Sequence, residues 1–262
     1  MLPKEGARPE PVPTPIWRAH IGWIKPGPVS KTIDQFFGLT PPDVNIVIST
    51  TMWSLKMTNQ QQFDPASIKD GQATMLAMVR DLMAYEAMDF LAVTGDLVQC
   101  ALGMDWNHGM RAAVEDASGR PAATAMTAAV DALREVGASR VAIATPVSDV
   151  KNAAVKAYLE AAGFAVVGVG GIATQSSHDI RSLPLTAPYD MARRVFEASP
   201  GADAIYLPSL TWRATEFAAR LEHELGVPVV TLYNSLIWRS LTAIRYPTPI
   251  RGFGGLLERI GG

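Results

Sequence analysis

Short apolar runs alternate along the chain with longer stretches in which apolar positions recur every three or four residues. Short runs bounded by turn residues are typical of buried strands, whereas the periodic stretches are typical of helices. Strands are predicted at residues 20–25, 44–49, 90–94, 122–125, 140–145, 165–169, 204–207 and 228–232. Helices are predicted at residues 67–88, 128–136, 149–162 and 215–225. Because strands and helices alternate, we expect an α/β fold with mainly parallel sheets.

Three of these helices are each followed by a glycine and then directly by a strand. The glycines are Gly137, Gly163 and Gly226. Glycine favours the left-handed conformation that ends a helix just beyond its last turn, and such short connections are usual in α/β units. The segments DALREVGASRVAIATP, LEAAGFAVVGV and LEHELGVPVVTLYN all follow this plan and make a weak internal repeat.

The 262 residues are 48% hydrophobic, which is enough apolar material for one large core or for two similar lobes. The formal net charge of -2 gives no basic footprint for a nucleic acid or a membrane surface. No apolar run reaches the roughly 20 residues that span a bilayer. We therefore expect neither a nucleic-acid partner nor a membrane partner.

Residues 1–15 are rich in proline and charge and lack the apolar segment of a signal peptide, so we expect a flexible N-terminal arm. The single cysteine, Cys100, excludes an intramolecular disulfide, fits a cytoplasmic location and is interpreted as an ordinary buried thiol. The four histidines are scattered without metal-ligand spacing. We therefore expect neither a bound metal nor another cofactor.

Two predicted strand ends share a pattern in which an acidic residue and an apolar run precede small polar residues. The first is DFLAVTGD, which ends at Asp96, and the second is ADAIYLPSLT, which contains Ser209. Ligands of open α/β sheets bind at the carboxyl ends of strands. Asp96 is therefore a candidate general base, or a group that binds an amine, amide or hydroxyl, and alternatively a helix cap. Ser209 is a candidate substrate-binding residue or weak acid, and alternatively the N-cap of a helix over 210–225.

Other residues near the strand ends carry weaker signals. Lys25 precedes a Pro26–Gly27 turn, where it would supply a countercharge to an anionic substrate; a plain tight turn is the alternative. Thr94 and Thr211 would donate either to a carboxylate or to local backbone groups. His178, followed by an aspartate, could form a general base, but its Ser- and Gly-rich surroundings favour a surface loop.

Taken together, these segments resemble the aspartate/glutamate racemase superfamily, in its maleate isomerase and arylmalonate decarboxylase branch. The resemblance covers residues 20–257 and is carried by the order and spacing of RPAATAMTAAVDALREVGASRVAIATPVSDVKNAAVKAYLEAAGFAVVGVGGI, ADAIYLPSLTWRATEFAARLEHELGVPVVTLYNSLIWRSL and IRGFGGLL. It implies two pseudo-symmetric Rossmann-like lobes with the site in the cleft between them. The lobes are expected at 16–137 plus 239–262, and at 138–238.

The resemblance also implies a cleft that holds a carboxylate with backbone N–H groups and small hydroxyls, beside cysteine thiolates that transfer protons. Racemases and isomerases of this group carry a cysteine at both strand ends, and decarboxylases carry the second alone. Here Gly95 stands at the first position and Ser209 at the second. Asp96 and Leu97 stand where small hydroxyl residues usually hold the carboxylate. Val147 stands where a tyrosine is usual.

These departures lead to a first hypothesis of a cofactor-independent, decarboxylase-like lyase or isomerase. It would act on a small carboxylic acid through an enolate-like intermediate, without a cysteine as acid or base. Asp96 and Ser209 are the expected catalytic residues. The expected substrate-binding residues are Lys25, Pro26, Gly27, Thr94, Gly95, Leu97, Val147, Leu210 and Thr211. A two-cysteine racemase is disfavoured because the chain has one cysteine.

The alternative hypothesis is a relative that binds a small carboxylate without catalysis. Each departure from the family pattern would also be expected in a protein that has lost the catalytic activity. Convergence of Asp96 and Ser209 on one cavity, with His178 as a further candidate and with a perturbed carboxylate, would favour the enzyme. An open or apolar cavity would favour binding alone. A hydrolase with Ser209 as nucleophile is disfavoured, since LPSLT lacks the G-x-S-x-G pattern. Apolar helices and the resemblance favour a homo-oligomer.

Overall fold

The computed structural model describes residues 16–27, 31–51, 64–174 and 177–262. The arm predicted over 1–15 lies outside these residues. Eight strands are present in the described part. They are β1 (Ala19–Pro26), β2 (Val44–Thr51), β3 (Phe90–Val93), β4 (Ala122–Thr124), β5 (Arg140–Val147), β6 (Ala165–Thr174), β7 (Ala204–Leu207) and β8 (Val229–Thr231). Seven coincide with predicted strands to within a few residues, whereas β6 continues five residues beyond its predicted end at 169.

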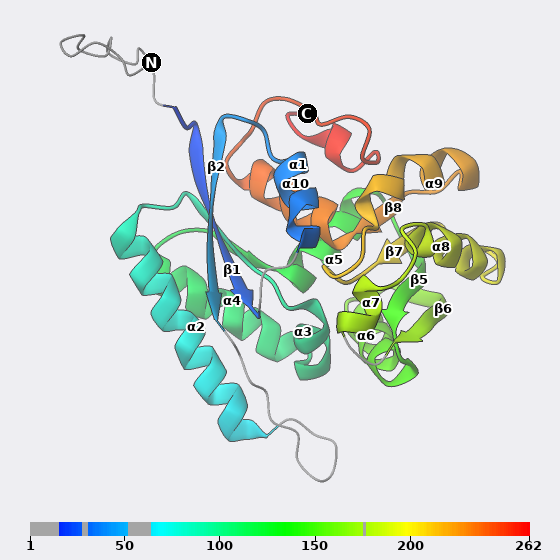
Figure 1. The fold of residues 1–262 in the computed structure, drawn as a ribbon, viewed down its shortest axis with the longest axis horizontal. Coiled ribbons are helices and arrows are strands. Elements are labelled where there is room, and N and C mark those ends of the chain that lie inside the picture. Colours follow the sequence, from blue (N-terminus) through cyan, green and yellow to red (C-terminus); the bar gives the residue numbers. More distant parts are fainter. Residues whose placement is uncertain (1–15, 28–30, 52–63, 175–176) are drawn as a thin grey trace, which may run out of the picture.

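The strands form two four-stranded sheets with the same internal order. The first sheet runs β2-β1-β3-β4 and the second β6-β5-β7-β8, and all strand pairs are parallel. In each sheet, the strand that comes second along the chain, β2 or β6, lies at the edge beside the strand that comes first, β1 or β5 (Figure 1). This repeated order confirms the predicted α/β class with two similar parallel sheets.

The predicted helices are present as α2 (Pro65–Tyr85), α5 (Ala125–Glu135), α6 (Asp149–Ala161) and α9 (Ala218–Leu225). Gly137, Gly163 and Gly226 follow three of them with φ of 78°, 96° and 70°, which confirms the predicted stops. The helix predicted over 215–225 begins with a short 3-10 turn, η2 (Thr215–Phe217), that leads into α9, so the alternative start at residue 210 is wrong.

Several helices were not placed by the sequence pattern. They are α1 (Asp34–Leu39), α3 (Asp96–Leu102), α4 (Met104–Ser118), α7 (Ser177–Arg181), α8 (Ala187–Glu197) and α10 (Leu232–Ala243), with 3-10 turns η1 (Lys31–Ile33) and η3 (Leu257–Arg259). Most of α10 is buried, so it lacks the one-sided apolar stripe by which a surface helix is recognised. Short α7 also replaces the loop that was expected around His178.

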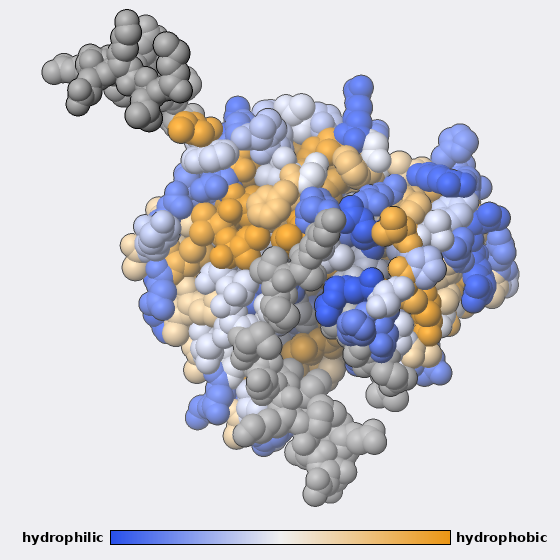
Figure 2. All heavy atoms as spheres, in the orientation of Figure 1, coloured by the Kyte–Doolittle hydropathy of each residue, from blue (hydrophilic) through white to orange (hydrophobic). Residues whose placement is uncertain are grey.

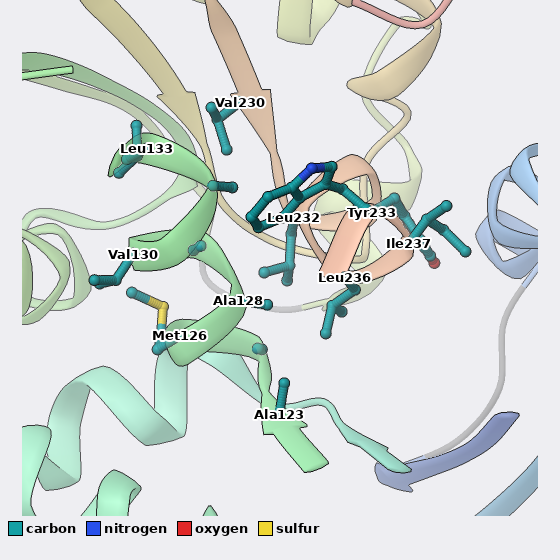
Figure 3. Packing of buried hydrophobic residues seen from close by; sticks show 14 of the residues in the cluster. Ala123, Met126, Ala128, Val130, Leu133, Val230, Leu232, Tyr233, Leu236 and Ile237 are labelled. Carbon is teal, nitrogen blue, oxygen red and sulfur yellow. The ribbon is translucent and has the colours of Figure 1, made fainter. Parts of the chain in front are cut away.

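Helices α5 and α10 lie between the two sheets (Figure 1). Each directly follows the last strand of its sheet, and each begins with a capping box, at Thr124 and at Thr231. Met126 and Val130 of α5 pack in one cluster with Leu232 and Leu236 of α10 (Figure 3). Because α10 also contacts β3 of the first sheet, the core joins the two halves. The predicted lobe boundaries at 137/138 and 238/239 stay a prediction.

Apolar side chains gather on one face of the molecule, over the region where β2 and α1 lie (Figure 2). The exposed large hydrophobic residues of the described chain include Ile16, Trp17 and Phe37. In the part of the chain that the structure describes, no helix is both long enough and apolar enough to cross a membrane.

Candidate active site

A cavity of about 120 Å³ lies where carboxyl ends of strands from both sheets meet. Its walls come from the ends of β1, β3, β5, β6 and β7 and from the helices that follow them. The lining residues are Lys25, Pro26, Thr94, Gly95, Asp96, Leu97, Val147, Lys151, Thr174, Ile180, Ser209, Leu210 and Thr211. This is the sheet edge at which α/β proteins bind ligands. Hollows of about 150 and 320 Å³ elsewhere on the described surface are not at such an edge.

The cavity brings together all the predicted site residues except Gly27. Gly27 instead forms a tight turn in which its N–H donates to the Lys25 carbonyl at 3.0 Å. Sequence reasoning missed Lys151, Thr174 and Ile180 as lining residues. Lys151 stands in the first turn of α6, directly after β5. That position was a usable signal, because a helix that follows a parallel strand begins at the same sheet edge.

Asp96 is the first residue of α3, and Gly95 before it occupies the N-cap with φ 107°. Asp96 Oδ2 accepts a hydrogen bond of 2.7 Å from the backbone N–H of Ser209, a residue 113 positions away in the other half of the molecule. The side chain is buried. Burial raises the pKa of Asp96, while the N–H groups of Ser209 and Leu97 and the charge of Lys25 oppose this rise. Asp96 therefore bridges the two strand ends instead of serving as the N-cap.

Ser209 lies in a strained turn just after β7. Its φ is 84°, in the left-handed region that non-glycine residues rarely occupy. Its hydroxyl lies 2.6 Å from the Thr211 hydroxyl and accepts from the Thr211 N–H at 3.2 Å. The expectation that Ser209 caps a helix is wrong, because the next helical turn begins at Thr215. Among the described residues, no histidine or lysine hydrogen-bonds to this hydroxyl, which weighs against a serine nucleophile.

Lys25 and Lys151 bring positive charge to the cavity from opposite halves of the molecule. Burial lowers the pKa of Lys25, and the nearby Asp96 carboxylate raises it in part. Lys151 is exposed. The Thr94 hydroxyl lies 3.4 Å from the Ile24 carbonyl, which is the local backbone contact considered as its alternative role. Val147 and Leu210, both buried, add apolar surface to the cavity walls.

Cys100 and His178 are not among the residues that line the cavity. Cys100 is buried in α3, one turn beyond Asp96. Burial, together with the negative charge of Asp96, raises the pKa of the Cys100 thiol well above its ordinary value. The thiol is therefore protonated and inert at neutral pH. His178 is exposed on α7. Within the described segments, no group of three His, Cys, Asp or Glu side chains is placed to hold a metal ion.

Comparison with known proteins agrees with this architecture. The arylmalonate decarboxylase family model matches residues 38–257. The chain is 30% identical over 162 residues to arylmalonate decarboxylase from Bordetella bronchiseptica, and the alignment spans 60% of this chain and 65% of that enzyme.

Solved structures show the same fold. Unliganded arylmalonate decarboxylase superimposes with a TM-score of 0.78 at 23% identity, covering 92% of this chain and 99% of that one. The maleate isomerase Iso from Pseudomonas putida S16 gives 0.77 at 18% identity, with 92% and 99% covered. These relatives are a decarboxylase and an isomerase, in agreement with the predicted branch. The chain belongs to the arylmalonate decarboxylase family.

Proposed function

We propose that this protein is a cofactor-independent, decarboxylase-like lyase or isomerase that acts on a small carboxylic acid through an enolate-like intermediate, without a cysteine as acid or base. The observation that carries the proposal is the buried Asp96 carboxylate in the cavity at the strand ends, 2.7 Å from the Ser209 N–H. A carboxyl with a raised pKa is a general acid–base suited to near-neutral pH. Family membership supplies the reaction class.

The absence of a thiol from the cavity lining supports the cysteine-independent part of the proposal. Cys100, the one cysteine of the chain, is buried behind Asp96 in α3. Ser209 at the second strand end has an ordinary hydroxyl, which is a poor acid and base at pH 7. Burial raises the pKa of Asp96 and lowers the pKa of Lys25, and both residues line the cavity. Proton transfer therefore falls to them.

Substrate binding in this proposal relies on positive charge. Asp96 already accepts the Ser209 N–H, so that donor is not open to a substrate carboxylate. Lys25 and Lys151 remain as countercharges from the two sides of the cavity. They would hold the acid and stabilise the negative charge that develops as an enolate-like species forms. The volume of about 120 Å³ suits a small substrate.

The alternative function is binding of a small carboxylate without turnover. The observation that favours it is the same hydrogen bond, because an internal carboxylate fills a position that a ligand could otherwise take. In that case, Lys25 and Lys151 would recognise the ligand, and Asp96 would only connect the two strand ends.

Incubation of the protein with malonates, maleate and α-substituted small acids in D₂O, followed by proton NMR, separates the two functions. We expect CO₂ loss, cis–trans isomerisation or deuterium exchange at the α-carbon for at least one acid. No reaction with any acid of the panel, together with a rise in melting temperature on adding one of them, would overturn the enzyme function and favour the binding protein.

A further inference from the structure

Lys25 lines the cavity beside the first strand end, where the resemblance places a cysteine in racemases and isomerases. Lys25 is the next-to-last residue of β1, and Pro26 after it abuts the Gly95 turn of β3. A side-chain Cβ at Gly95 would lie 3.0 Å from Pro26 Cγ, so the β1 end fills that space. Lys25 and Pro26 both line the cavity with Gly95 and Asp96. An ionisable group from β1 thus faces the cavity beside a strand end that carries no side chain.

Two ionisable groups from other elements surround Lys25 in the described part of the cavity. Asp96 of α3 carries the opposite charge, and Lys151 of α6 carries the same charge. Cys100, farther along α3, is a neutral thiol that feels the charge of Asp96. Burial acts on Lys25 and Asp96 in opposite directions: it lowers the pKa of the lysine and raises the pKa of the aspartate. An ammonium with a lowered pKa is a stronger acid than an ordinary lysine.

We propose that Lys25 delivers the proton that completes the reaction, in the role that a cysteine thiol performs in relatives. In a decarboxylation, the bond between the α-carbon and the departing carboxylate breaks, and its electron pair stays on the α-carbon as CO₂ leaves. The Lys25 ammonium then gives one proton to that carbon, and a C–H bond forms. The neutral Lys25 amine recovers a proton from water, with the Asp96 carboxylate as counter-ion. No oxidant, reductant or second substrate is consumed.

The other polar groups of the cavity suit this step less well. The hydroxyls of Ser209 and Thr211 lie 2.6 Å apart and are paired with each other. Lys151 is exposed, whereas Lys25 is half-buried. Asp96, the other acid–base group of the proposed function, is held by the Ser209 N–H at 2.7 Å and in this step serves as the counter-ion of Lys25. Lys25 combines partial burial with an adjacent carboxylate. This inference rests on the proposed function.

Two substitutions of Lys25 distinguish a role in delivering a proton from a role as a positive charge that binds the substrate. Lys25→Met removes the amine and keeps an unbranched side chain, whereas Lys25→Arg keeps the positive charge on a group that does not release its proton at working pH. We expect both variants to lose at least about a hundredfold in kcat, the scale of a lost general acid. KM should rise in Lys25→Met and change little in Lys25→Arg. Lys156→Met is the matched control, because Lys156 pairs with Glu160 on the exposed face of α6.

The measurement is kcat and KM across pH for the wild type, both variants and the control, on any acid turned over by the wild type. Melting temperatures establish that each variant is folded. In a third variant, Lys25→Ala, which leaves space where the side chain was, an added small primary amine is expected to restore part of kcat. Lys25→Arg with wild-type kcat and an unchanged pH profile would overturn proton delivery and leave Lys25 as a binding charge, while the proposed function stands. A wild type without turnover on the panel overturns both.

Discussion

The backbone N–H of Ser209 donates a hydrogen bond of 2.7 Å to the carboxylate of Asp96, and the two residues follow strands of different sheets. This contact connects the β3 end directly to the β7 end across the cavity. It brings a negative charge to a place where the family resemblance implies that a substrate carboxylate is held. The cavity therefore differs from that of a two-cysteine enzyme in charge as well as in the missing thiols.

Asp96 should make stability depend on pH in a defined direction. Burial raises its pKa in the folded protein above the usual 3.8. The folded state therefore binds this proton more tightly than the unfolded chain does. The stabilisation from protonated Asp96 is fully present below the pKa that Asp96 has in the unfolded chain. It is lost as pH rises through the raised pKa that Asp96 has in the folded protein.

Urea unfolding of the wild type and of Asp96→Asn at a series of pH values from about 4 upwards tests this direction. The free energy of unfolding of the wild type, minus that of the variant, should fall as pH rises. A difference that rises over this range would mean that the Ser209 and Leu97 N–H groups and Lys25 outweigh burial, and that the folded pKa is lowered.

Ser209 should tolerate glycine better than alanine. Its φ of 84° is costly for any residue with a Cβ, by about 1–2 kcal/mol, and costs glycine little. Both substitutions remove the contact with the Thr211 hydroxyl, so the difference between their free energies of unfolding reports the cost of the backbone conformation. We expect Ser209→Gly to be more stable than Ser209→Ala by about 1 kcal/mol in urea unfolding. Equal stabilities would show that this turn relaxes to a negative φ.

Gly95→Cys, which would restore the first family cysteine, should destabilise the protein. The φ of 107° is unfavourable for a residue with a side chain, and the new Cβ would lie 3.0 Å from Pro26 Cγ. In a double-mutant cycle, the loss should be smaller in a Pro26→Ala background, because the ring that crowds the Cβ is gone. An unchanged loss in that background would assign the whole cost to the backbone conformation.

A thiol placed by Ser209→Cys should be slow to react because Asp96 lies beside it. A neighbouring carboxylate disfavours the thiolate, which is the reactive form. In Ser209→Cys combined with Asp96→Asn, alkylation by iodoacetamide at pH 7 should be about tenfold faster, as expected for one pKa unit. The wild type gives the background rate of the buried Cys100. If removing the charge leaves the rate unchanged, Asp96 is not an anion at this pH.

The sequence predicted the strands and several helices because their apolar patterns and glycine stops are local. It did not place α10, since a helix that is buried nearly all round has no polar face to mark its period. The alternative helix start at residue 210 is wrong because Ser209 takes a positive φ, which no local sequence pattern indicates. The rule that α/β proteins bind ligands at the carboxyl ends of strands predicted that Lys25, Asp96 and Ser209 would line one cavity, as they do.

The hydrogen bond between Asp96 and Ser209 could not be predicted from sequence. It joins residues 113 positions apart and depends on how the two sheets dock through α5 and α10. Lys151 also lines the cavity, from the second half of the molecule. Its place at the sheet edge could have been inferred from its position just after β5, but its sharing of one cavity with Lys25 could not. Local periodicity identifies the sheet edge, whereas the charges that face each other across it follow from tertiary packing.

The most direct test of the account is turnover in D₂O, compared between the wild type, Asp96→Asn and Asp105→Asn. Asp105 is the matched control, because it is an exposed aspartate in the first turn of α4, as Asp96 is a buried one in the first turn of α3. We predict CO₂ loss, isomerisation or α-carbon deuterium exchange that falls at least about a hundredfold in Asp96→Asn and is unchanged in Asp105→Asn. Equal rates in the wild type and Asp96→Asn would contradict the account and remove Asp96 from the chemistry.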